Sequence, residues 1–189
     1  MRITSGSARG ISLHSPKTDL RPSMDRVRSA LFSMVGQQLQ GIRVIDLFAG
    51  TGALGLEALS RGAEHATFVE SNPIAIDSIQ LNLSKAKLLH KAQIIRSDVF
   101  AFLGSLSTPA HLILADPPYH KDPEGVDIAS KLLIDPHLPR HLRTDGVLAL
   151  EHHPKNAPTV PSSWQCVDSR SYGASALSFF RAAAPALPE

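Results

Sequence analysis

The stretch VIDLFAGTGALGLEAL, residues 44–59, decides the fold of this chain of 189 residues. Its first half is an apolar run typical of a buried strand, and its second half repeats apolar residues at helical spacing. Gly50, Gly52 and Gly55 lie at the junction in the pattern G-x-G-x-x-G. Glycines there allow a tight turn and let a ligand approach the free N–H groups of the helix. The stretch predicts a ligand-binding loop, although a tight turn without a ligand has the same pattern.

Strands and helices alternate along the chain from this stretch onward. The predicted strands are residues 42–48, 66–70, 92–97, 111–116 and 146–151, and the predicted helices are residues 53–61, 73–87 and 126–135. Such alternation indicates parallel pairing, and continuous aliphatic strands indicate a sheet that is covered on both faces. Residues 164–170 and 174–180 are predicted to form an antiparallel pair. The fold class is therefore α/β, with a doubly wound and mostly parallel sheet.

Residues 1–40 are predicted to extend this sheet domain. The segment RITSGSARGISL indicates a hairpin, and a helix is predicted to begin at Pro22 and Ser23 and to end at Gly41. Residues 1–30 hold six basic and two acidic residues, whereas the whole chain has a net charge of only +2. Such a segment indicates an anionic partner such as nucleic acid, or else a solvated arm. We expect the main domain over residues 41–183 and a flexible tail over residues 184–189.

The composition is that of an ordinary globular protein, with 43% hydrophobic and 19% charged residues. The single cysteine, Cys166, excludes an internal disulfide and a cysteine-based zinc site. The first residues contain no signal-peptide pattern, and no segment has the apolar length of a membrane span, so we expect a cytoplasmic protein. The sequence is silent on oligomeric state, and a monomer is the default expectation. The neighbouring pairs His137/His141 and His152/His153 are expected on the surface rather than at a metal.

Three acidic residues are predicted at one edge of the sheet. Glu70 ends the second strand and Asp98 follows the third, and the carboxyl ends of parallel strands form the ligand crevice of such folds. There Glu70 can accept hydrogen bonds from ribose hydroxyls, and Asp98 from an adenine amino group. Asp46 lies inside the first strand, where a carboxylate is costly unless it is hydrogen-bonded. We therefore expect Asp46 to fix the glycine loop, with the amino end of the ligand within its reach.

Two ligands suit this arrangement, a nicotinamide dinucleotide and S-adenosylmethionine. Both offer an adenosine ribose, but a dinucleotide also needs its pyrophosphate held at the helix N-terminus. The carboxylate of Asp46 beside that approach suits an ammonium or sulfonium ligand better than a dianion. S-adenosylmethionine is therefore the expected cofactor, and no metal is expected.

The fourth strand ends in Asp116-Pro117-Pro118-Tyr119, which is predicted to face the same crevice. The exocyclic amine of a nucleobase is a poor nucleophile because its lone pair is delocalised into the ring. A carboxylate and a rigidly held backbone carbonyl can accept its N–H groups and direct the lone pair toward a methyl donor. Tyr119 can stack on a flipped or looped-out base. The tetrapeptide predicts N-methylation of a base, although in isolation it also suits a plain strand-ending turn.

The motifs DLFAGTGALGLEAL, FVE, SDV and DPPY are similar to those of class I S-adenosylmethionine-dependent methyltransferases of the amino-group type. The N-terminal RITSG…RG, followed by LRPSMDRVRSALF, resembles more narrowly the RsmD-type family, which methylates a guanine N2 of bacterial 16S ribosomal RNA. The resemblance runs from Arg2 to about Phe180. It implies a Rossmann-like sheet of seven strands with the last antiparallel, and 16S rRNA or the small ribosomal subunit as substrate.

The resemblance also implies roles for the residues that match the family motifs. It places cofactor contacts on Asp46, Phe48, Gly50, Gly52, Glu70, Asp98 and Val99, catalytic contacts on Asp116, Pro117 and Tyr119, and RNA contacts on Arg9, Arg21, Arg26 and Arg28. The family often has Phe at the fourth catalytic position, and the Tyr119 of this chain keeps a ring that can stack.

Other functions are compatible with parts of the pattern. The tetrapeptide also permits methylation of adenine N6 or cytosine N4 in DNA. The glycine loop permits a nicotinamide-dependent oxidoreductase, and the basic N-terminal segment permits a non-catalytic RNA-binding module. Nucleoside digestion after methyl transfer, and binding of NADH or S-adenosylhomocysteine, distinguish these functions.

Overall fold

The computed structural model describes residues 1–16, 22–119, 125 and 127–183. The predicted contact residue Arg21 and the predicted tail, residues 184–189, lie outside the described residues. The helices are α1 (Pro22–Val35), α2 (Ala53–Ser60), α3 (Pro73–Ala86), α4 (Val99–Leu103) and α5 (Ile128–Ile134). The strands are β1 (Arg43–Leu47), β2 (His65–Glu70), β3 (Ala92–Arg96), β4 (Ala110–Ala115), β5 (Leu142–His152), β6 (Trp164–Tyr172) and β7 (Ser175–Ala182). Two 3-10 turns, Leu89–Lys91 and Leu138–His141, precede β3 and β5.

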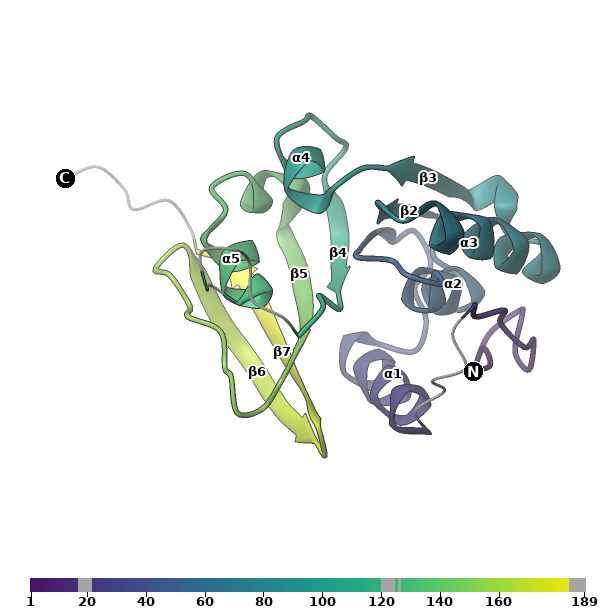
Figure 1. Ribbon diagram of the computed structural model, residues 1–189, viewed down its shortest axis with the longest axis horizontal. Helices are drawn as coiled ribbons and strands as arrows, with labels where there is room; N and C mark the ends of the chain where they lie inside the picture. The colour runs from purple at the N-terminus through teal and green to yellow at the C-terminus, as the bar shows by residue number, and fades with distance from the viewer. Residues whose placement is uncertain (17–21, 120–124, 126, 184–189) are drawn as a thin grey trace.

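These strands form one sheet in the order β3-β2-β1-β4-β5-β7-β6 (Figure 1). Strands β1 to β5 pair in parallel, whereas β7 is antiparallel to both β5 and β6. The predicted α/β class, with a mostly parallel sheet and an antiparallel last strand, is confirmed. The strand order reverses between β1 and β4, which is the point where ligands bind in open parallel sheets.

Some predicted boundaries are wrong. The first helix ends at Val35 rather than at Gly41, and Gly36 just beyond it has a φ of 109°, which a helix cannot continue through. Helix α4 was not predicted, because five residues are too few to show a helical period. Strand β5 begins at Leu142, four residues before the predicted start, because it pairs with β4 across a register shift.

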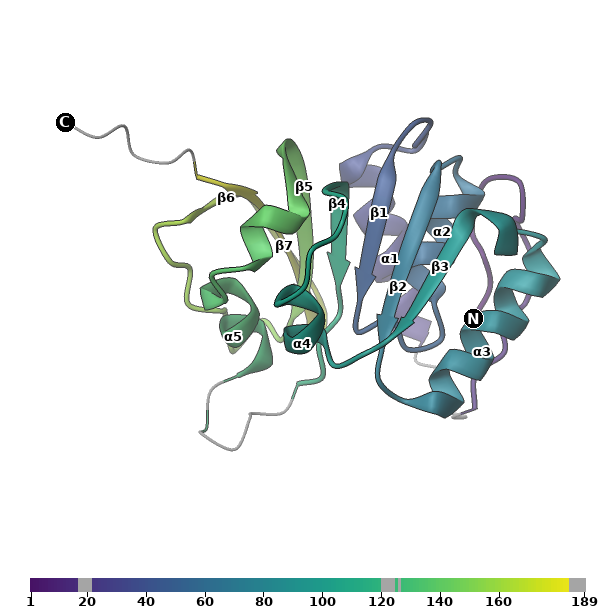
Figure 2. The ribbon, with the colours of Figure 1, turned by 90° about the horizontal axis from the view of Figure 1, so that it is seen from above.

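Helices cover both faces of the sheet (Figure 2). Helices α1, α2 and α3 share one core, represented by Phe32, Leu56 and Ile79. Helices α4 and α5 share the other core, with Phe102 and Leu132. Successive residues of the central strands β1 and β4 point to opposite cores, as the pleat requires. The sheet is therefore buried on both sides at its centre, and side chains at the strand ends are the ones left to face a ligand.

The N-terminal segment is fixed to α2 by a buried carboxylate. Glu57 is 0% exposed, and its oxygens accept hydrogen bonds from the backbone N–H groups of Thr4 (2.8 Å) and Ser5 (3.0 Å). The same carboxylate pairs with Arg61 at 2.9 Å and with Arg28 at 3.3 Å. Arg28 is 3% exposed, which contradicts its predicted contact with RNA. Its guanidinium is buried in an ion pair with Glu57, and a charge inside a protein is stable only when it is paired.

The predicted hairpin is present as a short turn. Arg2 and Ser12 form an antiparallel bridge, and the N–H of Ile3 donates to the carbonyl of Ile11 at 3.0 Å. Gly6 has a φ of 81° and lies against α2, where an added Cβ would be 1.7 Å from the Ser60 carbonyl oxygen. Only glycine fits this close approach, so the turn is shaped for its position on α2.

The predicted surface position of two histidines is wrong. His141 is 1% exposed, and its ring nitrogens bond to the Ser107 hydroxyl at 2.6 Å and to the Leu103 carbonyl at 3.0 Å. His152 is also buried, with its Nε2 2.9 Å from the Ser178 hydroxyl. Their hydrogen bonds explain how polar rings are accommodated in the core. Within the described part of the chain, no helix combines the length and apolar character needed to cross a membrane.

Candidate active site

The carboxyl ends of β1 to β4 meet at one edge of the sheet because these strands run parallel (Figure 2). Asp46 lies near the end of β1, Glu70 ends β2, Asp98 follows β3, and Asp116 directly follows β4. The structure thus brings the four acids identified in the sequence to one edge.

Two adjoining cavities open at this edge. The first, called here the Glu70 cavity, has a volume of about 470 Å³ and is lined by Phe48, Glu70, Ser97, Asp98, Val99, Phe100 and Ile128 among others. The second, the Asp46 cavity, has a volume of about 230 Å³ and is lined by Arg28, Leu31, Asp46, Gly50, Thr51 and Glu151 among others. Phe48 and Asp116 line both cavities and therefore mark the boundary between them.

Phe48 follows β1 in a strained conformation. Its φ is 57°, in the left-handed region that bulky residues rarely adopt, and Gly50 follows with a φ of 55°. The ring packs edge-on against Phe100, with the ring centroids 6.4 Å apart. Backbone strain of this kind persists where the surroundings enforce it, often at functional sites. Here it holds an aromatic ring against both cavities.

Asp46 is hydrogen-bonded to the last glycine of the glycine loop. Its side chain is 1% exposed, and its Oδ2 accepts a hydrogen bond from the N–H of Gly55 at 2.8 Å. The expected bond to the loop is therefore present. Burial raises the pKa of Asp46 well above its usual range, and the nearby carboxylates Asp116 and Glu70 raise it further. Gly55 is required in this position, because a Cβ there would be 2.4 Å from the ring of Phe68.

Glu70 orders the glycine loop and the start of α3. Its Oε2 accepts from the N–H of Gly50 at 2.7 Å, and its Oε1 accepts from the N–H groups of Ser71 (2.9 Å) and Asn72 (2.8 Å). The carboxylate faces the Glu70 cavity with these bonds already fixing its direction. It is therefore a pre-positioned acceptor for a hydroxyl group of a ligand.

We expect the substitution Glu70→Gln to weaken binding of S-adenosylhomocysteine about 10- to 100-fold, the effect of losing a charged hydrogen-bond acceptor. The glutamine keeps the length of the side chain, but its amide nitrogen cannot accept from the backbone or from a ribose. Isothermal titration calorimetry measures the change, with the exposed Asp77→Asn on α3 as the matched control. Unchanged affinity in Glu70→Gln would remove Glu70 from the cofactor site.

Asp98 is the N-cap of α4. Its Oδ1 accepts from the N–H groups of Phe100 at 2.9 Å and Ala101 at 3.1 Å. Both bonds use one oxygen, and the residue lines the Glu70 cavity together with Val99. A capping role alone would explain an acid at this position. Its contact with adenine stays a prediction.

Asp116 has a neighbour that the sequence analysis did not assign. Glu151 lies in β5 next to Asp116, since the preceding residues Ala115 and Leu150 are paired in parallel register. Burial, together with the negative charge of Glu151, raises the pKa of Asp116 to about 8. The signal was available in the sequence, because Glu151 ends the fifth predicted strand in the same way as Glu70 ends the second.

The raised pKa of Asp116 predicts a pH-dependent stability. Between pH 3.8 and about 8 the folded protein retains a proton that the unfolded chain has lost, so this group destabilises the fold as the pH rises through that window. We expect Asp116→Asn to be more stable than the wild type by about 1–3 kcal/mol at pH 8, less than the full shift because solvent screens the cavity mouth. At pH 5 the gain should be smaller. Urea unfolding at both pH values measures it, and an equal gain at both would contradict the assignment.

Tyr119 is hydrogen-bonded to Glu151, the neighbour of Asp116. Its hydroxyl donates to Oε1 of Glu151 at 3.0 Å and lies 3.2 Å from the Ser175 hydroxyl. Its ring contacts His153 edge-on and is 46% exposed. Burial raises the pKa of the phenol above its usual value, so Tyr119 stays protonated at neutral pH. Pro117, between the acid and the ring, is buried. The ring lines neither of the two cavities, and its hydroxyl bond to Glu151 is what connects it to the Asp46 cavity.

The predicted RNA-binding arginines differ in their exposure to solvent. Arg9 and Arg26 are exposed, Arg28 is buried with Glu57, and Arg21 is not described. Only the two exposed residues remain as described candidates for phosphate contacts.

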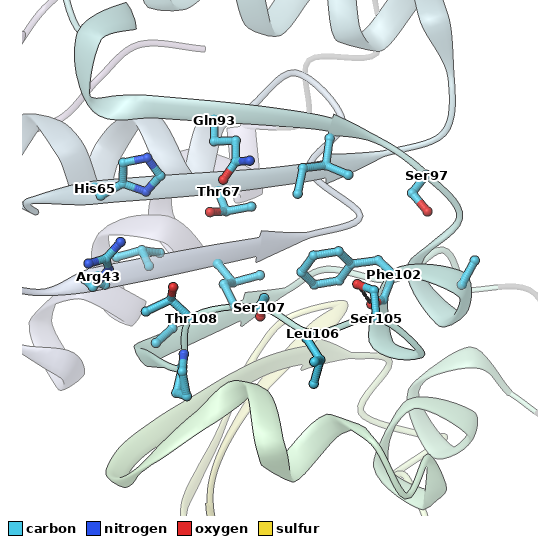
Figure 3. A pocket seen from close by; sticks show the side chains of 16 residues that line it. Arg43, His65, Thr67, Gln93, Ser97, Phe102, Ser105, Leu106, Ser107 and Thr108 are labelled. Atoms are coloured by element: carbon cyan, nitrogen blue, oxygen red, sulfur yellow. Dashed lines mark hydrogen bonds between the residues drawn. The ribbon is translucent and has the colours of Figure 1, made fainter.

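A larger hollow lies on the α4 side of β1, β2 and β3 (Figure 3). Its volume is about 670 Å³, and its wall is formed by side chains of the three strands, such as Arg43, Thr67 and Gln93, and by the loop after α4. No acidic side chain of the described residues lines it. Size alone assigns no chemistry, and the strand-end acids lie at the other cavities.

The antiparallel β7 distinguishes this sheet from a dinucleotide-binding one, in which the strands continue in parallel. Together with the acids around the glycine loop, it defines the S-adenosylmethionine-dependent methyltransferases, and the chain is an enzyme of that class. The cofactor suits the residues present. The Glu70 cavity offers aromatic and aliphatic walls with acceptors for an adenosine, and the Asp46 cavity offers carboxylates for cationic groups.

Within this class, the chain belongs to the family described as Conserved hypothetical protein 95, whose model matches residues 1–181. It is 39% identical to the putative rRNA methyltransferase YlbH of Bacillus subtilis, over 80% of this chain and 82% of that protein. It is 34% identical to ribosomal RNA small subunit methyltransferase D of Escherichia coli, over 87% of this chain and 81% of that protein. Among solved structures, the putative methyltransferase yhhF of Escherichia coli matches with a TM-score of 0.81 and 30% identity, over 96% and 97% of the two chains. The resemblance found in the motifs is confirmed.

Proposed function

We propose that this enzyme transfers a methyl group from S-adenosylmethionine to the exocyclic N2 of a guanine in the 16S rRNA of the small ribosomal subunit. The observation that carries the proposal is the position of Asp116, at the end of β4 and at the boundary of both cavities. The relatives named as rRNA methyltransferases support the substrate class.

Residues of the Glu70 cavity are proposed to bind the cofactor. Phe48 and Phe100 pack against the adenine, Glu70 accepts from the ribose, and Asp98 accepts from the adenine amino group. The carboxylate of Asp46 stabilises the cationic part of the ligand. When bound, S-adenosylmethionine supplies an electrophilic methyl group on a sulfonium.

Asp116 and the backbone carbonyl of Pro117 are proposed to hold the target amine. Two acceptors at fixed angles take up its N–H groups and leave the nitrogen lone pair directed at the methyl group. Asp116 loses its own proton more readily when a cationic ligand occupies the cavity, since an opposite charge favours the carboxylate. Tyr119 stacks on the base and keeps water from the reacting atoms.

The RNA backbone is proposed to contact the basic N-terminal segment, with Arg9 and Arg26 on phosphates. Each such contact adds a slope of about −0.7 to −0.9 to the dependence of log affinity on log salt concentration. We propose further that the enzyme acts as a monomer in the cytoplasm, where ribosomal subunits are assembled.

The test is methyl transfer from labelled S-adenosylmethionine to 16S rRNA, small subunits and duplex DNA, followed by digestion to nucleosides. N2-methylguanosine from the rRNA or the subunit is the expected product. Mass mapping of rRNA from cells lacking the gene, with and without complementation, locates the nucleotide. Methylated adenine or cytosine in DNA would instead establish the alternative reaction.

A further inference from the structure

Glu151 stands beside the proposed catalytic acid in a fixed register. Ala115 of β4 pairs with Leu150 of β5, and Asp116 and Glu151 are the next residues on these neighbouring parallel strands. Neighbouring strands lie about 4.8 Å apart, and residues in register point to the same face of a sheet. Both side chains line the Asp46 cavity. Two carboxylates therefore face the same cavity, and one of them, Asp116, is the proposed acceptor of the target amine.

The contacts of Glu151 leave part of its carboxylate for a ligand. Its Oε1 accepts from the Tyr119 hydroxyl at 3.0 Å, and that hydroxyl is also 3.2 Å from the Ser175 hydroxyl. Within the described part of the chain, this is the hydrogen bond that the Glu151 side chain makes, and it does not involve Oε2. The bond fixes the direction of the carboxylate and connects it to the ring that is proposed to cover the base.

A second acceptor beside the target amine can distinguish guanine from adenine and cytosine. Beside its exocyclic N2, guanine carries a second donor, the N1–H group. Beside the amines of adenine and cytosine lies a ring nitrogen with a lone pair, N1 or N3. An ionised carboxylate at that position accepts from guanine and repels the lone pair of the other two bases. Buried polar groups discriminate strongly in this way because the wrong base leaves them unpaired.

We infer that Glu151 accepts a hydrogen bond from the N1–H of the target base and thereby restricts the enzyme to guanine. Asp116 and the Pro117 carbonyl then accept from the amine, and Glu151 accepts from the adjacent N1–H group of the ring. This inference deepens the proposed function and rests on it. The position of Glu151 beside Asp116 supports the inference. Its negative charge raises the pKa of Asp116, so the pair is repulsive, and packing does not explain a second acid at this position.

The test compares base analogues at the mapped target position of the rRNA. Guanine and 6-thioguanine both carry N1–H, whereas 2-aminopurine keeps the 2-amino group but has an unprotonated N1. The wild-type enzyme should methylate the first two and act on 2-aminopurine at least about 100-fold more slowly. The thio analogue controls for the change at position 6.

The variant Glu151→Gln should methylate guanine about 10- to 100-fold more slowly, with a smaller preference for guanine over 2-aminopurine. Its amide oxygen still accepts from Tyr119, while its N–H group can face an unprotonated N1. Binding of S-adenosylhomocysteine should not change, and Glu64→Gln, an exposed acid, serves as the matched control.

Each other outcome overturns the inference. Equal wild-type rates on guanine and 2-aminopurine would show that N1–H is not read, and this arm needs no folded variant. A variant that keeps the wild-type rate and preference, or that loses both substrates equally, would leave Glu151 as an anchor for Tyr119 only. In all three cases guanine methylation by the wild type stands. Absence of guanine methylation by the wild type refutes the proposed function itself.

Discussion

Replacing Asp116 by alanine is expected to lower kcat for methyl transfer by about 10³-fold or more, the scale of removing a positioned polar group from a transition state. The carboxylate is the side-chain acceptor placed at the boundary of both cavities, and alanine leaves one N–H of the amine without a partner. Binding of S-adenosylhomocysteine should stay within about threefold of the wild type, because Phe48 and Glu70 still form the cofactor cavity.

Single-turnover kinetics with saturating cofactor separates this loss from weaker binding. Asp77→Ala, which removes an exposed acid on α3, should keep the wild-type rate. Asp116→Asn is expected to lie between alanine and the wild type, because its amide oxygen accepts one hydrogen bond but its nitrogen cannot. Unfolding does not account for a loss of activity in Asp116→Asn, since this variant is expected to be more stable than the wild type at pH 8. Full activity of Asp116→Ala would refute the assignment.

Replacing Glu57 by alanine is expected to destabilise the protein by about 3–5 kcal/mol, the cost of breaking a buried ion pair from one side. Glu57 compensates two guanidinium groups, of Arg28 and Arg61, that are themselves almost fully buried. It also accepts from the backbone of Thr4 and Ser5, which would lose their partner. The N-terminal segment should therefore detach from α2 as the stability falls.

Equilibrium urea unfolding measures the effect on Glu57→Ala. Glu64→Ala, an exposed acid close by in sequence, should change the stability by no more than about 0.5 kcal/mol. Glu57→Gln should lose less than alanine, because its oxygen still accepts a hydrogen bond. A loss below about 1 kcal/mol in the alanine variant would show that the two arginines find other partners.

The strands and most of the helices could be predicted because their signals are local. The aliphatic run of residues 112–115 and the glycines of residues 50–55 differ from their surroundings in the sequence itself. Helix α4 was missed because it spans little more than one turn. The early end of α1 was missed because nothing at Gly36 marks it as the stop in preference to Gly41.

The individual acids of the site could be predicted from the sequence, but the residues that pair with one another in space could not. Asp46, Glu70 and Asp116 could be identified because each ends or interrupts an apolar strand. The partner of Arg28 could not, because Glu57 lies 29 residues away on another helix. An arginine in a basic segment looks available for phosphate until a buried carboxylate is found beside it.

The sequence by itself determined the class of fold, the glycine loop and the series of acids at strand ends, because periodicity, glycine and charge act through near neighbours in the chain. Only the tertiary structure decided which charges are buried together, that Glu151 stands beside Asp116, and that Tyr119 is anchored to it. Such contacts join residues far apart in the chain, and their energies depend on burial, which arises only when the sheet and its helices pack.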